Sequence, residues 1–161
     1  MPRDAQPPDP YVYGLAALGR RELTERQLRT RLERRGCAVD DVDAAIARLK
    51  RERVLDDQRS ARAFARTEAR IKHRGPLRIR RTLESMGVDK ETARSATDEG
   101  FEERSVDEAL EAALARKLRG PVLDDRHAQR LVGYLVRQGF DLSASIAAVR
   151  TCRRGNEAEE S

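Results

Sequence analysis

The residue types that most often carry catalysis are few in this sequence and stand apart from one another. Its two histidines are His73 and His127, and its two cysteines are Cys37 and Cys152. The sequence contains no CxxC pair, no GxSxG or HExxH motif and no phosphate-binding loop of the Walker A type. We therefore expect no enzymatic activity, no metal site and no cofactor.

Asp56 and Asp57 form an adjacent pair of carboxylates that could suggest acid–base chemistry. The pair directly precedes a predicted helix, where carboxylates accept hydrogen bonds from free backbone N–H groups and interact favourably with the helix dipole. Helix capping explains the pair better than catalysis does. His73 lies between Lys72 and Arg74, where a solvated turn residue or a phosphate contact is a better explanation than a general base.

Arginine is the residue type that could carry a function through binding. The sequence has 33 Lys and Arg residues, nearly all of them Arg, and a net charge of +5. Arg binds phosphate and carboxylate groups bidentately, although a GC-rich genome would give the same excess without selection for binding. In one predicted helix, spacings of three and four residues place four arginines on one stripe. They are Arg59, Arg62, Arg66 and Arg70.

A continuous basic stripe can contact a polyanion, and the alternative is an ordinary solvated helix face. The following segment favours the first interpretation, because it adds basic residues with almost no acids to neutralise them. These are Arg74, Arg78, Arg80 and Arg81. Residues 58–81 are strongly basic, whereas residues 88–111 are strongly acidic. Phe64 and Ile71 mark the opposite side of the stripe helix, which we expect to be buried.

Short helices are the elements that would position these arginines. The composition is 39% hydrophobic and only 4% aromatic, with no Trp, which favours closely packed helices around a thin core over sheets. A first helix is predicted from Pro10 to about Arg20. The next helix has a clearer start, because Thr24 and Gln27 form a capping box. We therefore predict an all-α protein.

A repeated triplet divides the sequence into three units. An apolar residue, a second one four positions later and a Gly eight positions later recur at nearly equal intervals. The copies are Leu28, Leu32, Gly36; Ile79, Leu83, Gly87; and Leu131, Leu135, Gly139. Each Gly is expected to end a helix in the left-handed conformation. The next residue, Cys37, Val88 or Phe140, is expected in the core, and Asp40, Asp89 or Asp141 is expected to cap a further helix.

Each triplet thus predicts a pair of helices joined by a tight turn. Longer helical patterns lie between these helix pairs, so we predict three helices in each unit. We place the units at residues 9–54, 55–99 and 100–152, between disordered tails at 1–8 and 153–161. The longest uncharged stretch, residues 10–19, is far shorter than the roughly 20 apolar residues of a membrane helix. No secretory signal is visible, and with two distant cysteines we expect a cytoplasmic protein.

One set of residues in the central part of the sequence has a characteristic spacing. These residues are Leu55, Asp56, Asp57, Arg59, Phe64, Gly75, Pro76, Arg78, Ile79, Arg80, Leu83, Gly87 and Val88. They resemble the signature of the RecX family of regulatory proteins. The flanking triplets, with Arg21, Thr24, Gln27 and Arg137, are similar to the opening and closing units of that family, so the likeness extends over residues 11–150. Three positions depart from the family pattern. Ser60 replaces an aromatic residue, Arg53 a common Gly, and Gln27 the usual Glu.

The resemblance implies a bent, elongated molecule of three tandem three-helix units. It also implies a partner, because RecX proteins bind the RecA recombinase filament on single-stranded DNA and lie in its groove. There they restrain ATP hydrolysis, strand exchange and coprotease activity in homologous recombination, DNA repair and the SOS response. We expect a monomer with weak, salt-sensitive binding to single- and double-stranded DNA.

On this interpretation the expected contacts to RecA or DNA are Arg59, Arg62, Arg66, Arg70, Arg74, Arg78, Arg80 and Arg81. The structural signature is Leu55, Asp56, Asp57, Gly75, Pro76, Ile79, Leu83 and Gly87. The alternative is a small basic DNA-binding protein with helix-turn-helix-like units, acting as a nucleoid or transcription factor. A sequence-specific reader would present Asn, Gln and Arg together on one recognition helix. Here the Gly-terminated helices carry mostly Arg, which favours the regulator.

Overall fold

The computed structural model describes residues 7–159, and in that part of the chain it contains nine α-helices and no strand. The helices are α1 (Pro10–Leu18), α2 (Glu25–Arg34), α3 (Val39–Arg51), α4 (Asp57–Arg70), α5 (Pro76–Ser85), α6 (Lys90–Gly100), α7 (Val106–Lys117), α8 (Asp125–Gln138) and α9 (Leu142–Glu159). The predicted all-α class is confirmed. None of these helices is long and apolar enough to cross a membrane.

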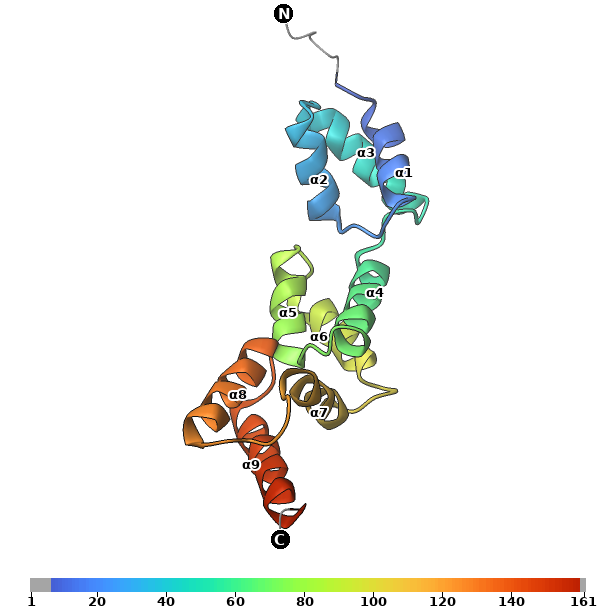
Figure 1. The fold of residues 1–161 in the computed structure, drawn as a ribbon. Helices are drawn as coiled ribbons and strands as arrows, with labels where there is room; N and C mark the ends of the chain where they lie inside the picture. The colour runs from blue at the N-terminus through green and yellow to red at the C-terminus, as the bar shows by residue number, and fades with distance from the viewer. Residues whose placement is uncertain (1–6, 160–161) are drawn as a thin grey trace, which may run out of the picture.

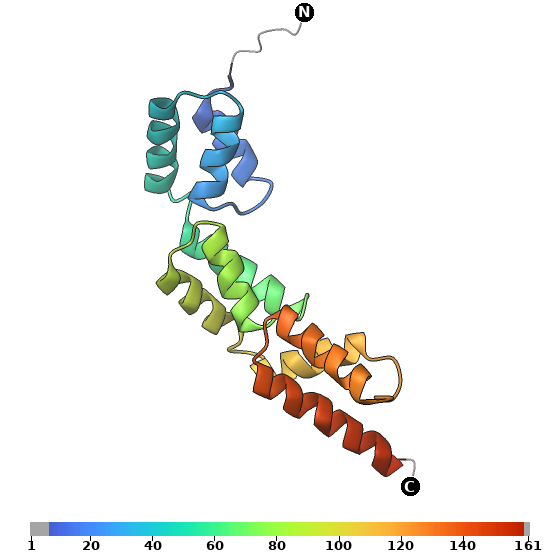
Figure 2. The same ribbon diagram turned by 90° about the vertical axis from the view of Figure 1, so that its left-hand side faces the viewer.

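The helices form three units of three that follow one another along an elongated, bent molecule (Figures 1 and 2). Helices α1–α3 surround one core, which includes Leu28, Leu32 and Leu49. Helices α4–α6 pack around a core made largely of alanines, and α7–α9 enclose a third core around Phe140. The tandem array of three-helix units predicted from the triplets is therefore confirmed.

Each triplet ends its helix in the same way. Its glycine has a φ of 80°, 91° or 100°, in the left-handed region that glycine adopts readily. The residue after the glycine donates its backbone N–H to the carbonyl of the triplet's second apolar residue, as in a Schellman motif. These pairs are Cys37 with Leu32, Val88 with Leu83, and Phe140 with Leu135. All three donors are buried, as predicted.

Most helix starts agree with the sequence, and one does not. The capping box of Thr24 and Gln27 is present, and the Asp89 side chain accepts a hydrogen bond from the backbone of Thr92. Asp141 likewise accepts from Ala144 N–H. Asp40 is not a cap, because α3 starts earlier with Ala38 at the N-cap position. Asp40 lies instead in the first helical turn, where its negative charge interacts favourably with the helix dipole.

The two ends of the described chain also differ from expectation. Helix α1 stops at Leu18, two residues short of the predicted end. Helix α9 continues to Glu159, so residues 153–159 are helical and the tail expected there is wrong. One reason is that Arg153 on α9 pairs with Asp125 at the start of α8, at 2.6 Å. The rest of the expected tails, residues 1–6 and 160–161, lies outside the described residues.

The second helices of the units, α2, α5 and α8, follow head to tail along one side of the molecule (Figures 1 and 2). At the first joint, between α1–α3 and α4–α6, Thr24 Oγ1 before α2 donates to the carbonyl of Met86 after α5, at 2.6 Å. At the second joint, between α4–α6 and α7–α9, Gly75 N–H donates to the carbonyl of Gln138 at the end of α8, at 2.8 Å. The positive end of one helix dipole thus meets the negative end of the next.

Candidate functional site

The predicted contact arginines divide into those with partners inside the molecule and those without. Five make ion pairs: Arg59 with Glu22 and Arg62 with Glu99, both at 2.9 Å, Arg80 with Asp98 at 2.8 Å, Arg70 with Glu103 at 2.5 Å, and Arg74 with Glu68 at 3.9 Å. Arg74 and Arg78 also donate hydrogen bonds to the next unit. Arg66 and Arg81 are exposed, and within residues 7–155 their side chains have no hydrogen bond or ion pair.

Arg59 is a structural residue of the first joint. Its guanidinium donates to the carbonyls of Arg53 at 3.1 Å and Val54 at 2.8 Å, in addition to its pair with Glu22. These three bonds join the start of α4 to two parts of the first unit, the segment before α2 and the end of the unit. The contact role predicted for Arg59 therefore competes with a role in holding two units together.

The acidic stretch neutralises part of the basic stripe, contrary to expectation. Helix α6 packs against α4 and α5, and the chain after α6 also returns to α4. This packing brings Asp98, Glu99 and Glu103 to arginines that are remote in sequence. Such exposed pairs contribute only about 0 to 1 kcal/mol each, so a partner can replace them at small cost.

The burial pattern of α4 also corrects one expectation. Phe64 is half-buried against the core, and Ala61 and Ala65 are fully buried. Ile71, expected on the same buried side, is 69% exposed. It occupies the C-cap position, where the helix ends and the side chain leaves the packed face. Glu68 is buried instead, where it pairs with Lys72 at 2.6 Å.

His73 and Arg74 lead from α4 into the second joint. His73 has a φ of 52°, so it is a turn residue in the left-handed region. Burial lowers its pKa from the usual value, and the charges of Arg104 and Arg116 lower that pKa further. These surroundings favour the neutral imidazole over the charged form. Arg74 donates to Gln138 Oε1 at 2.6 Å, and this bond fixes it between units.

The signature residues hold the fold and its joints. Leu55, Ile79 and Leu83 are core residues, Pro76 opens α5 at N1, and Gly87 is one of the left-handed helix ends. Gly75 lies directly against the backbone of the next unit, since an added Cβ would lie 2.6 Å from the backbone nitrogen of Phe140. Asp56 caps α4 by accepting from Arg59 N–H, as predicted.

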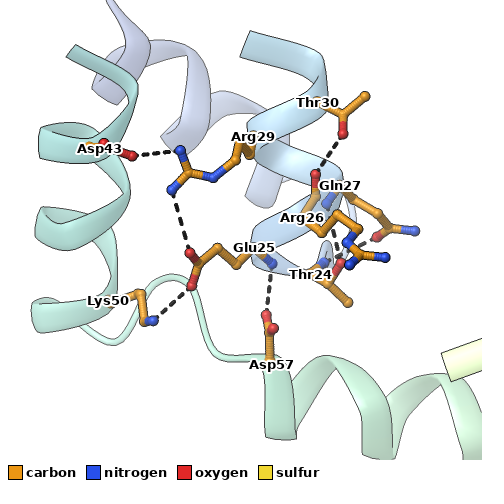
Figure 3. A network of polar contacts seen from close by, with 9 residues as sticks. All are labelled: Thr24, Glu25, Arg26, Gln27, Arg29, Thr30, Asp43, Lys50 and Asp57. Atoms are coloured by element: carbon orange, nitrogen blue, oxygen red, sulfur yellow. Dashed lines mark hydrogen bonds and ion pairs between the residues drawn. The ribbon is translucent and has the colours of Figure 1, made fainter. Parts of the chain in front are cut away.

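Asp57 has a role that the sequence did not reveal. Its carboxylate accepts a hydrogen bond from Glu25 N–H, at 2.7 Å, so a residue of the second unit caps α2 of the first (Figure 3). Burial raises the pKa of Asp57, and the bond from Glu25 N–H opposes that rise. The Glu25 carboxylate also lies between Lys50 and Arg29 (Figure 3). Only the folded arrangement of α2, α3 and α4 brings these groups together.

Sequence reasoning also missed a groove between α5 and α8, beside the second joint. Exposed Leu77 and Val136 line it, together with Arg78, Arg81 and Arg137. Arg137 was noted only as part of a family likeness, and no periodicity marks an apolar side chain that stays exposed. Among residues 7–155, whose side chains are described, no group of three or more His, Cys, Asp or Glu residues could hold a metal ion.

Comparisons with known proteins identify the family. The family model for the first three-helix domain of RecX matches residues 11–49, and the model for the second matches residues 56–96. Regulatory protein RecX of Thermotoga petrophila is 37% identical over 141 residues, which cover 88% of this chain and 83% of that protein. The chain belongs to the RecX family.

A second relative supports this assignment, and a solved structure shows the same fold, each over nearly the whole chain. Regulatory protein RecX of Halorhodospira halophila is 34% identical over 146 residues, covering 89% of this chain and 88% of that protein. The crystal structure of RecX from Lactobacillus salivarius has the same fold, with a TM-score of 0.71 over 92% of this chain and 95% of that chain at 17% identity. The Thermotoga and Halorhodospira proteins are named regulatory proteins, and none of these three names describes an enzyme.

Proposed function

We propose that this RecX protein binds the RecA filament on single-stranded DNA in the cytoplasm and restrains its ATPase, strand exchange and coprotease activities. The protein acts as a monomer and as a regulator without catalytic activity of its own. The observation that carries the proposal is the 37% identity to a regulatory protein RecX over 88% of this chain. Recombination, DNA repair and the SOS response are the processes it would affect.

The shape of the molecule supports a role on a filament. A row of three units, each contacting only its neighbour, exposes much surface per residue and can follow an extended partner. Arg66 and Arg81 are available for carboxylates or phosphates, and the exposed ion pairs of Arg62 and Arg80 can be exchanged for pairs with a partner.

The alternative, a sequence-specific DNA reader, is less well supported. In a helix-turn-helix, the N-terminal residues of the helix after the turn contact base edges in the major groove. The helix after the turn at Gly36 is α3, whose first turn carries Asp40 and Asp41. These carboxylates would be repelled by DNA phosphates. The first turn of α6 carries Glu91, which is equally unsuitable.

The DNA-dependent ATPase of RecA on a poly(dT) strand tests the proposal. We expect turnover and strand exchange to fall as this protein is added, and we expect the protein alone to hydrolyse no ATP. Salt is kept moderate, because strong non-specific binding at low salt could mimic inhibition. Unchanged RecA turnover and strand exchange at saturating protein would refute the proposed function.

A further inference from the structure

The groove beside the second joint combines exposed apolar side chains with unneutralised positive charge. It has a volume of about 510 Å³ and lies between α5 and α8. Leu77 is 45% exposed and Val136 is 40% exposed, one from each wall. Arg78 and Arg81 of α5 and Arg137 of α8 surround them, and no acidic side chain lines the groove.

The arginines of this groove differ from most of those of the α4 stripe, three of which are paired with acidic residues. Within the described residues, the Arg81 and Arg137 side chains have no ion-pair or hydrogen-bond partner. Arg78 donates to the carbonyl of Arg137 at 3.2 Å, which places its positive charge at the junction of the two walls. Three cations therefore meet at one place without an acid to balance them.

The walls of the groove are fixed to each other. Gly75 N–H bonds to the carbonyl of Gln138, and Leu77 N–H bonds to the carbonyl of Gly139 at 3.1 Å. This second bond holds the backbone of Leu77 against the opposite wall, although the Leu77 side chain is exposed. A ligand would meet a preformed site, and preformed sites lose less conformational entropy on binding.

We propose that this groove binds an acidic segment of a protein partner that carries aliphatic anchor residues. Carboxylates of the segment pair with Arg81 and Arg137, and the anchors pack on Leu77 and Val136. The inference rests on the proposed function, because it assumes that this protein acts through a protein partner. It goes beyond that function by naming a site and the chemistry that the site recognises.

Single-stranded nucleic acid fits the groove less well. Proteins that bind single strands usually stack bases on exposed aromatic side chains. The groove has one aromatic residue, Phe140, which is 1% exposed and packs in the core of the third unit. Leu77 and Val136 are aliphatic and provide no stacking surface. Charge and apolar contact together therefore favour a peptide over a nucleic acid.

A peptide-binding experiment tests the groove directly. The probe is a short fluorescein-labelled peptide rich in Glu with two Leu residues four positions apart, and its binding to the full-length protein is followed by fluorescence anisotropy. A peptide with Ser in place of both Leu residues and a dT oligonucleotide are the comparison ligands. We expect the first peptide to bind at least about tenfold more tightly than the Ser peptide, since two buried aliphatic side chains exceed the 1.4 kcal/mol that tenfold requires.

Two groove variants and one matched control locate the binding. The double variant Arg81→Glu/Arg137→Glu and the single variant Val136→Ser should each weaken peptide binding by about tenfold or more. Arg94→Glu changes an equally free, exposed arginine on α6, outside the groove, and should leave binding within about threefold. Circular dichroism confirms that each variant is folded. Val136→Ser alone, which keeps the charge unchanged, tests the groove even if the charge reversals unfold the protein.

Several outcomes would overturn the proposal. They are absence of peptide binding, equal binding of the Ser peptide, an equal loss with Arg94→Glu, and preferential binding of the dT oligonucleotide in the groove. The last result would assign the groove to nucleic acid.

The RecA assay separates this inference from the proposed function. If the groove variants inhibit RecA as well as the unmodified protein does, the groove is not the filament contact and the inference fails while the proposed function stands. If the unmodified protein binds the peptide in the groove but leaves RecA unaffected, the proposed function fails and the groove assignment stands.

Discussion

The two joints of this molecule have the same arrangement but are made by different atoms. In both, the start of one second helix meets the end of the next. At the first joint, side chains make the contacts: Thr24 Oγ1 donates to the carbonyl of Met86, and Asp57 accepts from Glu25 N–H. At the second joint, backbone groups bond directly, with Gly75 closely approached by Gly139. A single substitution can remove one side-chain contact of the first joint. The backbone contacts of the second joint form only because residue 75 is a glycine, which lets the two segments approach closely.

The largest effect is expected from Gly75→Val at the second joint. Any Cβ at this position would overlap the Gly139 carbonyl group and lie 2.6 Å from the backbone nitrogen of Phe140. Backbone cannot rotate away as a side chain can, so the joint must open. We expect a loss of about 3 kcal/mol or more in the free energy of unfolding, measured in urea.

Gly155→Ala is the control, because no atom lies within 4 Å of a Cβ built there and the residue is in α9. It should be neutral or stabilising by up to about 1 kcal/mol. A small effect of Gly75→Val would mean that the second joint is looser than its backbone contacts indicate.

Thr24→Val should have the next largest effect, at the first joint. The substitution keeps the shape of a fully buried side chain but removes the hydroxyl that donates to Met86 and accepts from Gln27 N–H. Two buried backbone groups lose a partner, which costs about 2 kcal/mol in the free energy of unfolding. Urea denaturation followed by circular dichroism measures it.

Thr67→Val is matched to it, since the Thr67 hydroxyl bonds only within its own exposed helix turn, to the carbonyl of Ala63. That control should change stability by less than about 0.5 kcal/mol. Equal losses from both substitutions would show that the bond across the first joint adds nothing to stability.

The local features of both joints could be predicted from the sequence. Which residues meet across each joint could not. The triplets and the capping box depend on backbone bonds within a few residues, so spacing alone revealed them. Asp57 reaches Glu25 only because α4 packs beneath α2, and Glu99 reaches Arg62 only because α6 folds back along α4.

Contacts of that kind depend on tertiary packing, which a residue pattern does not record. For this reason the sequence did not show that Arg59, Arg62 and Arg70 have acidic partners, although it placed the stripe on one helix. The prediction that Ile71 is buried was wrong for a related reason. Helical periodicity assigned it to the buried face, but the helix ended at the residue before it.

The contribution of the first joint to stability should depend on pH more than that of the second, because Asp57 titrates and backbone amides do not. Burial raises its pKa, so folded protein binds the Asp57 proton more readily than unfolded protein does. The contribution of Asp57 to stability therefore falls as pH rises through the range between its unfolded and folded pKa values. Asp89 and Asp141 have lowered pKa values, chiefly because they accept hydrogen bonds from Thr92 N–H and the Ser143 hydroxyl respectively. Their contributions are instead lost as pH falls through the acidic range.

Asp57→Asn tests this balance. The amide oxygen can still accept from Glu25 N–H without a buried charge, so we expect stability at pH 7 to change by less than about 0.5 kcal/mol. Asp57→Ala removes the acceptor and should cost about 1 kcal/mol. Urea midpoints at pH 4 and pH 7 measure both. A loss with Asp57→Asn as large as that with Asp57→Ala would mean that the negative charge itself holds the first joint.

The smallest change in stability is expected from substitutions at the residues just before each joint. Among residues 7–159, the residues other than glycine with positive φ are Arg53, at 57°, before the first joint, and His73, at 52°, before the second. Arg53→Gly relieves the left-handed strain of about 1 kcal/mol, but glycine increases the entropy of the unfolded chain, so we expect a net gain of only about 0.5 kcal/mol. The bond from Arg59 survives, because it ends on the backbone carbonyl of Arg53.

His73→Gly relieves the same strain but also removes a half-buried ring, so it should gain less than Arg53→Gly or lose stability. Urea midpoints of the two variants give the comparison directly. If Arg53→Gly destabilises the protein while His73→Gly does not, the exposed Arg53 side chain must contribute to the first joint. The first joint would then depend on side chains at a position where the backbone geometry alone favours glycine.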